Sequence, residues 1–215
     1  MTTNATAMPQ GGMTVYLVDD EPAVRTALSF LLRSRGLQVL AFESGEALLA
    51  TLDAWPRVPP GCFLLDVRMD GGIGGLALHD ALIARRLRHP VLFLSGHGDI
   101  PMVVDALKKG AFDFLEKPYS DNTLVDRISQ ALDVAAAQGA DAARDAEVRA
   151  RLASITPRER EVMRMVAAGR LNKQIAADLA LAMRTVEVYR ARVFAKLELR
   201  SAAELGALLA QYPDD

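Results

Sequence analysis

The amino-acid sequence predicts a doubly wound α/β domain with a five-stranded parallel sheet, followed by a small all-α domain. Three observations predict this arrangement. The 215 residues suffice for two domains of ordinary size, each with a core of its own. Short apolar runs alternate with helical patterns over residues 13–137, as expected when helices join the strands of a parallel sheet. After residue 152 the pattern is helical only.

Five apolar runs have the length and composition of buried strands. They are Thr14–Val18, Val39–Phe42, Cys62–Leu65, Val91–Leu94 and Phe112–Leu115. Helix-length segments separate them, which is the kind of connection that parallel strands need. These helices are expected over Pro22–Arg35, Gly45–Leu52, Leu76–Arg86, Pro101–Lys108 and Asn122–Ala137. In such a sheet, ligands bind beyond the carboxyl ends of the strands, where the strand order reverses.

A linker and four short helices follow. From Ala131 to Ala153 the chain is rich in Ala, Asp and Arg, and a partly helical linker is expected. Thr156 can cap the next helix, Pro157 suits its first position, and Glu159 completes a capping box. Further helices are expected over Asn172–Leu179, over Met183–Leu197 and from Ser201. The predicted domains are a disordered N-terminal segment over 1–12, the α/β domain over 13–137, a helical linker over 138–151 and the all-α domain over 152–215.

Composition and charge narrow the class of protein. No apolar run approaches the roughly 18 residues of a membrane span, and the first residues lack a signal peptide, so a cytoplasmic protein outside membranes is expected. Cys62 is the only cysteine, which excludes an intrachain disulfide.

Residues 1–137 carry 16 acidic and 12 basic side chains, whereas residues 152–215 carry 8 acidic and 10 basic side chains. This asymmetry suits a metal site in the first half and a phosphate-backbone partner for the second. His79 and His89 have no partner at metal-ligand spacing and are expected at the surface or at helix ends.

Five polar residues lie at the ends of the predicted strands. Asp19 and Asp20 end the first strand, Asp66 the third and Ser95 the fourth, and Lys117 follows the fifth. Because these ends meet at one edge of a parallel sheet, the side chains are expected to lie together. Three carboxylates there would repel one another unless a hard cation such as Mg²⁺ lay between them. One carboxylate could then attack phosphorus, while the metal, the lysine and the hydroxyl stabilise the phosphoryl oxygens.

Each of these residues alone has an ordinary explanation. Asp after a strand often caps the next helix, Lys-Pro is a common turn, and Ser is frequent in loops. Their joint placement at four strand ends of one topology is the stronger signal. It predicts an acceptor of phosphoryl groups.

Four motifs in the first half resemble those of the receiver domains of two-component response regulators, and of the FixJ-like branch in particular. They are Val18-Asp19-Asp20-Glu21, Leu64-Leu65-Asp66-Val67-Arg68-Met69, Leu94-Ser95-Gly96-His97-Gly98-Asp99 and Phe112-Asp113-Phe114-Leu115-Glu116-Lys117-Pro118. The resemblance implies a flavodoxin-like receiver fold over about residues 13–137. It also implies a histidine kinase as partner and Asp66 as the residue that is phosphorylated.

The same resemblance implies a role for the other site residues. Mg²⁺ would be held by Asp20, Asp66 and the backbone carbonyl of Arg68, with Asp19 acting through water. Ser95 and Lys117 would bind the phosphoryl group, and Lys117-Pro118 would be a cis peptide. Phe114 would move inward together with Ser95 on activation. His97 borders the expected pocket.

The loop after the acceptor departs from the family pattern. Met69 is followed by Asp70 where the family has Pro, and the glycine-rich stretch over 71–75 is one residue longer. Four glycines make a loop costly to order. This leaves open the position of the loop in the active state and the lifetime of the phosphate.

From Leu152 to Leu208 the chain resembles a LuxR-type helix-turn-helix domain. The motifs are Thr156-Pro157-Arg158-Glu159-Arg160-Glu161-Val162, Asn172-Lys173-Gln174-Ile175-Ala176, Thr185-Val186-Glu187-Val188-Tyr189-Arg190 and Lys196-Leu197. The resemblance implies a scaffold helix over Asn172–Leu179 and a recognition helix over Met183–Leu197 that enters the major groove of DNA. Core positions are expected at Ile175, Val186, Val193 and Leu197.

The candidate DNA-contacting residues are Asn172, Lys173, Arg184, Thr185, Glu187, Val188, Arg190, Ala191 and Arg192. Basic side chains among them can reach phosphates or guanine edges, and Glu187, Val188 and Ala191 would set base preference. Charge alone favours a solvated helix face for these arginines; the motif reverses this preference and favours DNA contacts. Ala180 stands in place of a turn glycine. Ala182 stands in place of a Ser or Thr cap, a loss of about 1 kcal/mol.

The sequence therefore indicates a transcription regulator activated by phosphorylation. Dimerisation through the fourth helix and fifth strand of the receiver, and a pseudo-palindromic site on double-stranded DNA, are expected. Apart from self-phosphorylation and slow dephosphorylation, it is not expected to be an enzyme. An alternative is a phosphorylation-independent regulator whose receiver is a protein-binding module. An aspartyl-phosphate phosphatase is disfavoured, because Asp66-Val67-Arg68 lacks the second carboxylate that would act as acid.

Overall fold

The computed structural model describes residues 8–9, 11–96 and 100–213. A sheet of five strands occupies the first half: β1 (Thr14–Val18), β2 (Gln38–Phe42), β3 (Gly61–Asp66), β4 (Val91–Ser95) and β5 (Asp113–Glu116). All neighbouring strands are parallel, in the order β2-β1-β3-β4-β5. The predicted five-stranded parallel sheet is confirmed, and no strand end differs from its prediction by more than one residue.

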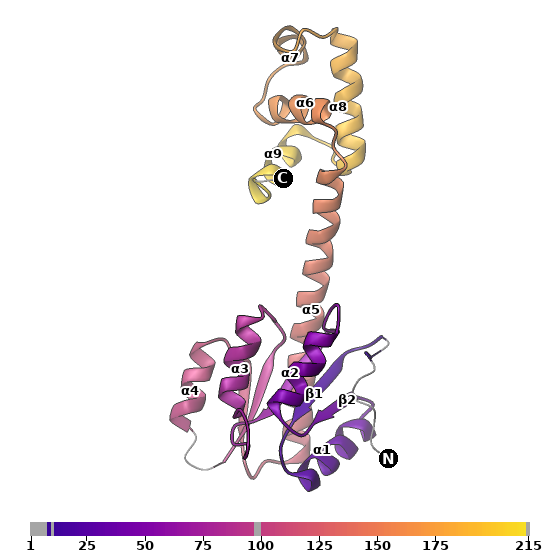
Figure 1. Cartoon of the computed structure of the whole chain (residues 1–215). Helices are drawn as coiled ribbons and strands as arrows, with labels where there is room; N and C mark the ends of the chain where they lie inside the picture. Colours follow the sequence, from indigo (N-terminus) through magenta and orange to yellow (C-terminus); the bar gives the residue numbers. More distant parts are fainter. Residues whose placement is uncertain (1–7, 10, 97–99, 214–215) are drawn as a thin grey trace. The chain divides into compact units, whose positions relative to one another are not determined.

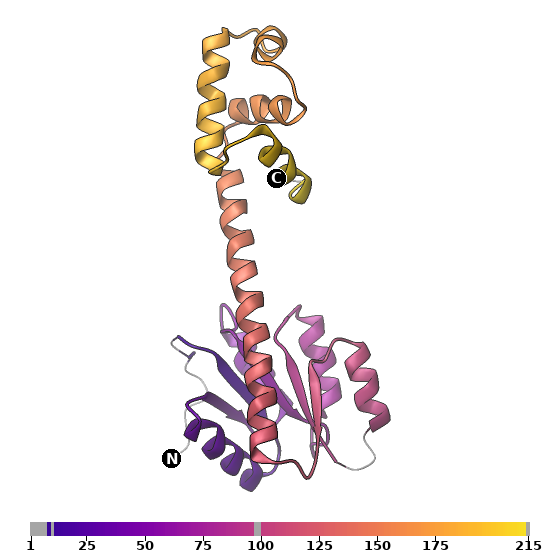
Figure 2. The same ribbon diagram turned by 180° about the vertical axis from the view of Figure 1, so that it is seen from behind.

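Helices cover both faces of this sheet. They are α1 (Pro22–Ser34), α2 (Gly45–Ala54), α3 (Gly75–Ala84), α4 (Ile100–Lys108) and α5 (Asp121–Ala153). One core lies between the sheet and α2, α3 and α4, and a second lies between the sheet and α1 and α5 (Figures 1 and 2). Because β1, β3 and β4 are buried on both sides, their sequences are continuous apolar runs.

Helix α5 is longer than predicted. The sequence suggested a helix ending at Ala137 and a partly helical linker, whereas the structure has one helix from Asp121 to Ala153. Alanine and arginine are strong helix formers, and Arg151 pairs with Glu147 one turn earlier. The chain divides into two compact units, residues 1–140 and 141–215, and α5 runs through this boundary. The domain limits at 137, 138 and 151 stay predictions.

Four helices follow α5 in the second unit: α6 (Pro157–Ala167), α7 (Asn172–Asp178), α8 (Met183–Leu197) and α9 (Ala202–Gln211). Thr156 and Glu159 form the predicted capping box at the start of α6. The expected core positions Ile175, Val186, Val193 and Leu197 are all buried. The predicted all-α architecture is confirmed.

Two smaller expectations have different outcomes. His79 is not at the surface: it is 3% exposed in α3, and its ring stands edge-on to Phe93 with centroids 5.6 Å apart, because this side of α3 faces the sheet. His89 is half-buried, with Nε2 2.9 Å from the Pro59 carbonyl oxygen. Residues 1–7 and 10 of the predicted disordered segment lie outside the described residues. In the part of the chain that is described, no helix is both long and apolar enough to cross a membrane.

Candidate functional site

Three carboxylates meet at the carboxyl edge of the sheet, as the sequence predicted. Asp19 and Asp20 follow β1, and Asp66 ends the neighbouring strand β3. One oxygen of each side chain lies within 4.8 Å of the others. Asp19 and Asp66 are buried, so their mutual repulsion is weakly screened by water. An arrangement of hard oxygen ligands of this kind could hold a divalent cation.

The Asp19 carboxylate shows the effect of this crowding. Its Oδ1 accepts a hydrogen bond from the Glu21 amide at 2.9 Å, while its Oδ2 is buried without a hydrogen-bond partner among the described residues. Burial raises the pKa of Asp19 above its ordinary value, and the charges of Asp66 and Asp20 raise it further, although the Glu21 amide and the Lys117 ammonium lower it. A cation among these oxygens would offset the free-energy cost of burying the charged carboxylates and would reduce the repulsion between them.

Lys117 and Ser95 reach the same edge from the last two strands. The Lys117 ammonium lies 2.8 Å from Oδ2 of Asp66, and the Lys117 amide donates to the Ser95 carbonyl at 2.8 Å. Burial alone would lower the pKa of Lys117, but the hydrogen bond and charge of Asp66 outweigh it and raise the pKa. Ser95 is fully buried, and its hydroxyl has no partner within the described ranges. Lys117-Pro118 is cis, as predicted.

The remaining predicted receiver residues lie around this cluster. Arg68 is exposed, two residues past the end of β3. Phe114 pairs in register with Phe93 and packs, half-buried, against the core beneath α3 and α4. His97 lies outside the described residues, together with Gly98 and Asp99.

Two side chains that contact this site were not identified from the sequence. Arg25 donates to the Asp19 carbonyl at 2.8 Å. Glu46, in the first turn of α2, accepts from the Ile73 amide at 2.8 Å and so holds the glycine-rich loop after β3. Neither residue belongs to a strand-end motif, and Glu46 lies 27 residues from its partner in the sequence. No local sequence signal could have found them.

Helix α8 presents one face opposite its buried side. Val186, Val193 and Leu197 point into the core. The candidates exposed on the far side are Arg184, Val188, Ala191 and Arg192. Thr185, Glu187 and Arg190 are half-buried at the flanks of this face, and Lys173 is exposed on α7. Met183, the first residue of α8, and Leu171, at the N-cap of α7, were not singled out from the sequence; they are 53% and 68% exposed.

Arg190 is tied to α7. Its Nη1 donates to Oδ1 of Asn172 at 2.8 Å, and its guanidinium lies 5.7 Å from the centroid of the Phe194 ring. Both members of the hydrogen bond are candidate DNA-contacting residues. This contact therefore connects α7 to α8.

The turn between α7 and α8 carries the two expected weaknesses. Ala180 has φ of 51°, the left-handed conformation in which a glycine costs less. Ala182 occupies the N-cap of α8 and has no side-chain oxygen to accept from the first turn.

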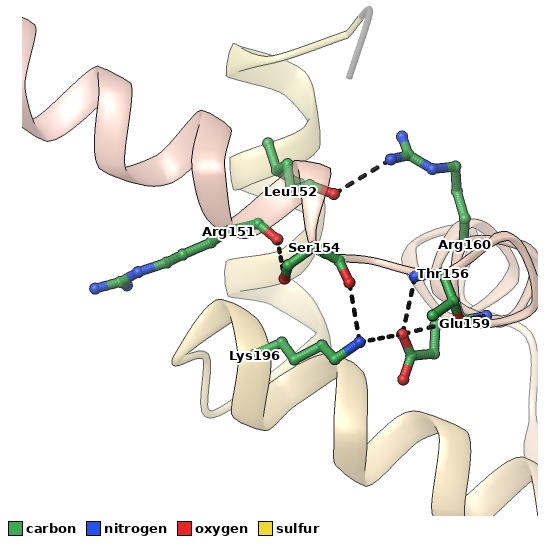
Figure 3. A network of polar contacts seen from close by, with 7 residues as sticks. All are labelled: Arg151, Leu152, Ser154, Thr156, Glu159, Arg160 and Lys196. Atoms are coloured by element: carbon green, nitrogen blue, oxygen red, sulfur yellow. Dashed lines mark hydrogen bonds and ion pairs between the residues drawn. The ribbon is translucent and has the colours of Figure 1, made fainter.

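A polar network joins the ends of α5, α6 and α8 (Figure 3). The Lys196 ammonium lies 2.9 Å from the Ser154 carbonyl and 2.6 Å from Oε2 of Glu159. The same carboxylate accepts from the Thr156 amide at 2.9 Å, and Arg160 donates to the Leu152 carbonyl at 3.2 Å. The capping box was predicted from the sequence; its connection to α8 was not.

Together, the acidic edge of the sheet and the helix-turn-helix unit define a two-component regulator that binds DNA. The family model "Response regulator receiver domain" matches residues 15–129, and "Bacterial regulatory proteins, luxR family" matches residues 153–209. The chain belongs to the response regulators that join a receiver domain to a LuxR-type DNA-binding domain.

Similar proteins span nearly the whole chain. The C4-dicarboxylate transport transcriptional regulatory protein DctR of Rhodobacter capsulatus is 47% identical over 91% of this chain and 98% of its own length. The transcriptional regulatory protein FixJ of Bradyrhizobium diazoefficiens is 42% identical over 89% and 91%. Among solved structures, the response regulator StyR is 37% identical with a TM-score of 0.83, covering 94% of this chain and 100% of that chain. Full-length FixJ from B. japonicum is 40% identical with a TM-score of 0.57, covering 95% and 98%.

Proposed function

We propose that the chain is a DNA-binding regulator activated by phosphorylation of Asp66, with a histidine kinase as the phosphoryl donor. The observation that carries the proposal is the position of Asp66: its side chain is 8% exposed, and its carboxylate lies 2.8 Å from the Lys117 ammonium within the acidic cluster. A carboxylate fixed beside a cation is oriented in advance for attack on an electrophile.

The cluster fits a magnesium ion. Asp19, Asp20, Asp66 and the backbone carbonyl of Arg68 would hold it, with Asp19 acting through water. The buried oxygen of Asp19 that has no partner among the described residues supports this role. When bound, Mg²⁺ neutralises charge on phosphoryl oxygens. The Lys117 ammonium and the Ser95 hydroxyl would each donate to one of these oxygens.

In the transfer step, a carboxylate oxygen of Asp66 attacks the phosphorus of a phosphohistidine. The new O–P bond forms as the P–N bond breaks, and the imidazole of the kinase leaves with the electron pair. Water later hydrolyses the aspartyl phosphate, which restores the carboxylate and releases inorganic phosphate. Self-phosphorylation and this hydrolysis are the only reactions that we assign to the chain.

Phosphorylation would shift Ser95 and Phe114 and thereby change the surface formed by α4 and β5. On α4, the apolar side chain of Val104 is 42% exposed; Met102, 43% exposed, lies on the side of α4 that faces α3. Dimerisation there would bring two recognition helices to a pseudo-palindromic site on double-stranded DNA, with Asn172 and Lys173 of α7 at the phosphates.

The test is labelling by acetyl phosphate, followed by a DNA titration. Asp66→Asn keeps the size of the side chain but removes the nucleophile, so it should abolish acid-labile phosphate on the protein. Asp126→Asn, at an exposed residue of α5, is the matched control and should label normally. Undiminished labelling of Asp66→Asn would overturn the assignment. Equal DNA affinity with and without phosphate would instead favour a phosphorylation-independent regulator.

A further inference from the structure

The loop over residues 70–75 is ordered despite its composition. It connects β3 to α3 and contains four glycines. Glycine loses more conformational freedom on ordering than any other residue, so specific contacts must hold such a loop in place. Gly71 has φ of 80°, a left-handed conformation that glycine adopts readily.

Backbone hydrogen-bond donors hold both ends of the loop at the acidic site. The Asp70 amide donates to Oδ2 of Asp20 at 2.9 Å. At the other end, the Gly75 amide donates to the Val67 carbonyl at 3.1 Å. A Cβ atom on Gly75 would lie 2.1 Å from the backbone oxygen of Asp66, so the loop packs directly on the main chain of the acceptor residue. The conformation of this loop therefore bears on the Asp20 carboxylate.

The middle of the loop is fastened to α2 by Glu46. Its Oε1 accepts from the Ile73 amide at 2.8 Å. The fit is close on both sides of this bond: a Cβ on Gly72 would lie 2.7 Å from the Glu46 carboxylate, and a Cβ on Gly45 would lie 2.6 Å from the Ile73 side chain. Two backbone amides, first that of Ile73 and then that of Glu46 itself, lower the pKa of Glu46 below its ordinary value. The carboxylate is therefore charged when it accepts this bond at neutral pH.

We propose that Glu46 is a positioning residue of the acidic site. By ordering the loop over 70–75, it holds the Asp70 amide against Asp20 and fixes the carboxylate before a cation arrives. A ligand side chain that is fixed in advance loses less freedom on binding, which strengthens the binding. This inference rests on the proposed function, because the orientation of Asp20 matters only if the site holds a cation.

The experiment compares three full-length variants with the unaltered protein. Glu46→Ala removes the acceptor of the Ile73 amide, whereas Glu46→Gln keeps an acceptor oxygen and removes only the charge. Glu43→Ala removes an equal charge from an exposed residue nearby and serves as the electrostatic control. Magnesium affinity is measured by isothermal titration calorimetry, and exchange of single loop amides is measured by NMR without magnesium.

Glu46→Ala should raise the magnesium dissociation constant about three- to five-fold, as expected for the loss of one hydrogen bond. In the same variant the Ile73 and Asp70 amides should exchange at least about five-fold faster, while amides of β1 and β3 stay unchanged. Glu46→Gln and Glu43→Ala should remain within about two-fold of the unaltered protein in both measurements.

Two results would overturn the inference. If Glu46→Ala leaves loop exchange unchanged, the loop does not depend on Glu46. If Glu46→Gln weakens magnesium binding as much as Glu46→Ala does, the effect is one of charge and not of positioning. Failure of the unaltered protein to bind magnesium would count against the proposed function, and the exchange data would still decide whether Glu46 orders the loop.

Discussion

The ammonium of Lys196, in the last turn of α8, lies 2.6 Å from the carboxylate of Glu159, in the first turn of α6. The Glu159 side chain is 4% exposed and that of Lys196 is 34% exposed. Removing the ammonium would leave a buried carboxylate with only the Thr156 donors. Hydrogen bonds to charged groups contribute more to stability than neutral ones do, so we expect this pair to contribute substantially to the packing of α8 against α6.

We therefore expect Lys196→Met to destabilise the second unit by about 2 kcal/mol. Urea unfolding followed by circular dichroism measures the loss of its helices. The only tryptophan, Trp55, lies in the first unit, so its fluorescence reports the receiver separately and should keep its midpoint. An unchanged helical transition would show that the pair contributes little.

Acid should weaken the same unit. The Lys196 ammonium, followed by the Thr156 amide, lowers the pKa of Glu159 to about 2, against about 4.5 for an ordinary glutamate. Because the pKa is depressed in the folded state, the stabilisation is complete above about pH 4.5 and is lost as the pH falls towards about 2. The difference in unfolding free energy between the unaltered protein and Glu159→Gln should shrink as the pH is lowered from 6 to about 3. A difference independent of pH would contradict this origin.

At the acidic site, Lys117→Ala should allow phosphorylation of Asp66 but prevent the dimerisation that follows from it. The ammonium lies 2.8 Å from Asp66, and its backbone amide is bonded to the Ser95 carbonyl. Without the ammonium, the phosphoryl oxygens lose their connection to β5, so labelling by acetyl phosphate should persist while dimerisation on phosphorylation is lost. Light scattering after size exclusion measures the dimer, with Arg57→Ala, an exposed residue between α2 and β3, as a control. Normal dimerisation of the phosphorylated variant would count against this role of Lys117.

The sequence was a good guide where the physical signal is local. β1, β3 and β4 are buried on both faces, so each appears as an unbroken apolar run whose limits are readable. The strand-end residues Asp19, Asp66 and Lys117 could be grouped because parallel topology alone brings their strand ends together. The cap of α6 was readable from four consecutive residues.

The sequence was a poor guide to contacts between distant segments. Glu46 meets Ile73 across 27 residues, Lys196 meets Glu159 across 37, and Arg190 meets Asn172 across 18. Helix packing sets these pairs, and the periodicity of a single segment does not encode them. The end of α5 was misjudged because an alanine-rich exposed helix and an alanine-rich linker have the same composition.

One substitution in the turn before α8 should stabilise the second unit. Ala180 has φ of 51°, where a Cβ atom is strained and glycine is not. Part of the gain is offset by the greater freedom of glycine in the unfolded chain, so Ala180→Gly should stabilise the second unit by about 0.5 kcal/mol. Urea unfolding by circular dichroism measures this. Ala177→Gly, within α7, is the control and should destabilise by about 1 kcal/mol; a loss of stability in both variants would refute the argument.

The last prediction concerns DNA. Arg192 is exposed on the face of α8 opposite the core, whereas Arg190 is half-buried and bonded to Asn172. We expect the double variant Arg190→Ala, Arg192→Ala to bind DNA more weakly and with a smaller dependence on salt. The slope of log affinity against log salt is negative, and each phosphate contact that is lost should reduce its magnitude by about 0.9. Fluorescence anisotropy of the phosphorylated protein on its best natural site, at several salt concentrations, measures both quantities.

The two single variants then separate the roles of the two arginines. Arg192→Ala should reduce the salt slope, because an exposed guanidinium acts as a phosphate contact. Arg190→Ala should reduce affinity also by freeing Asn172 and α7, an effect that salt does not change. Arg158→Ala, on α6 and paired with Glu161, is the charge control and should leave both quantities unchanged. If the double variant keeps the affinity and the salt slope of the unaltered protein while circular dichroism shows intact helices, α8 does not face DNA, and the DNA-binding surface lies elsewhere on residues 152–208.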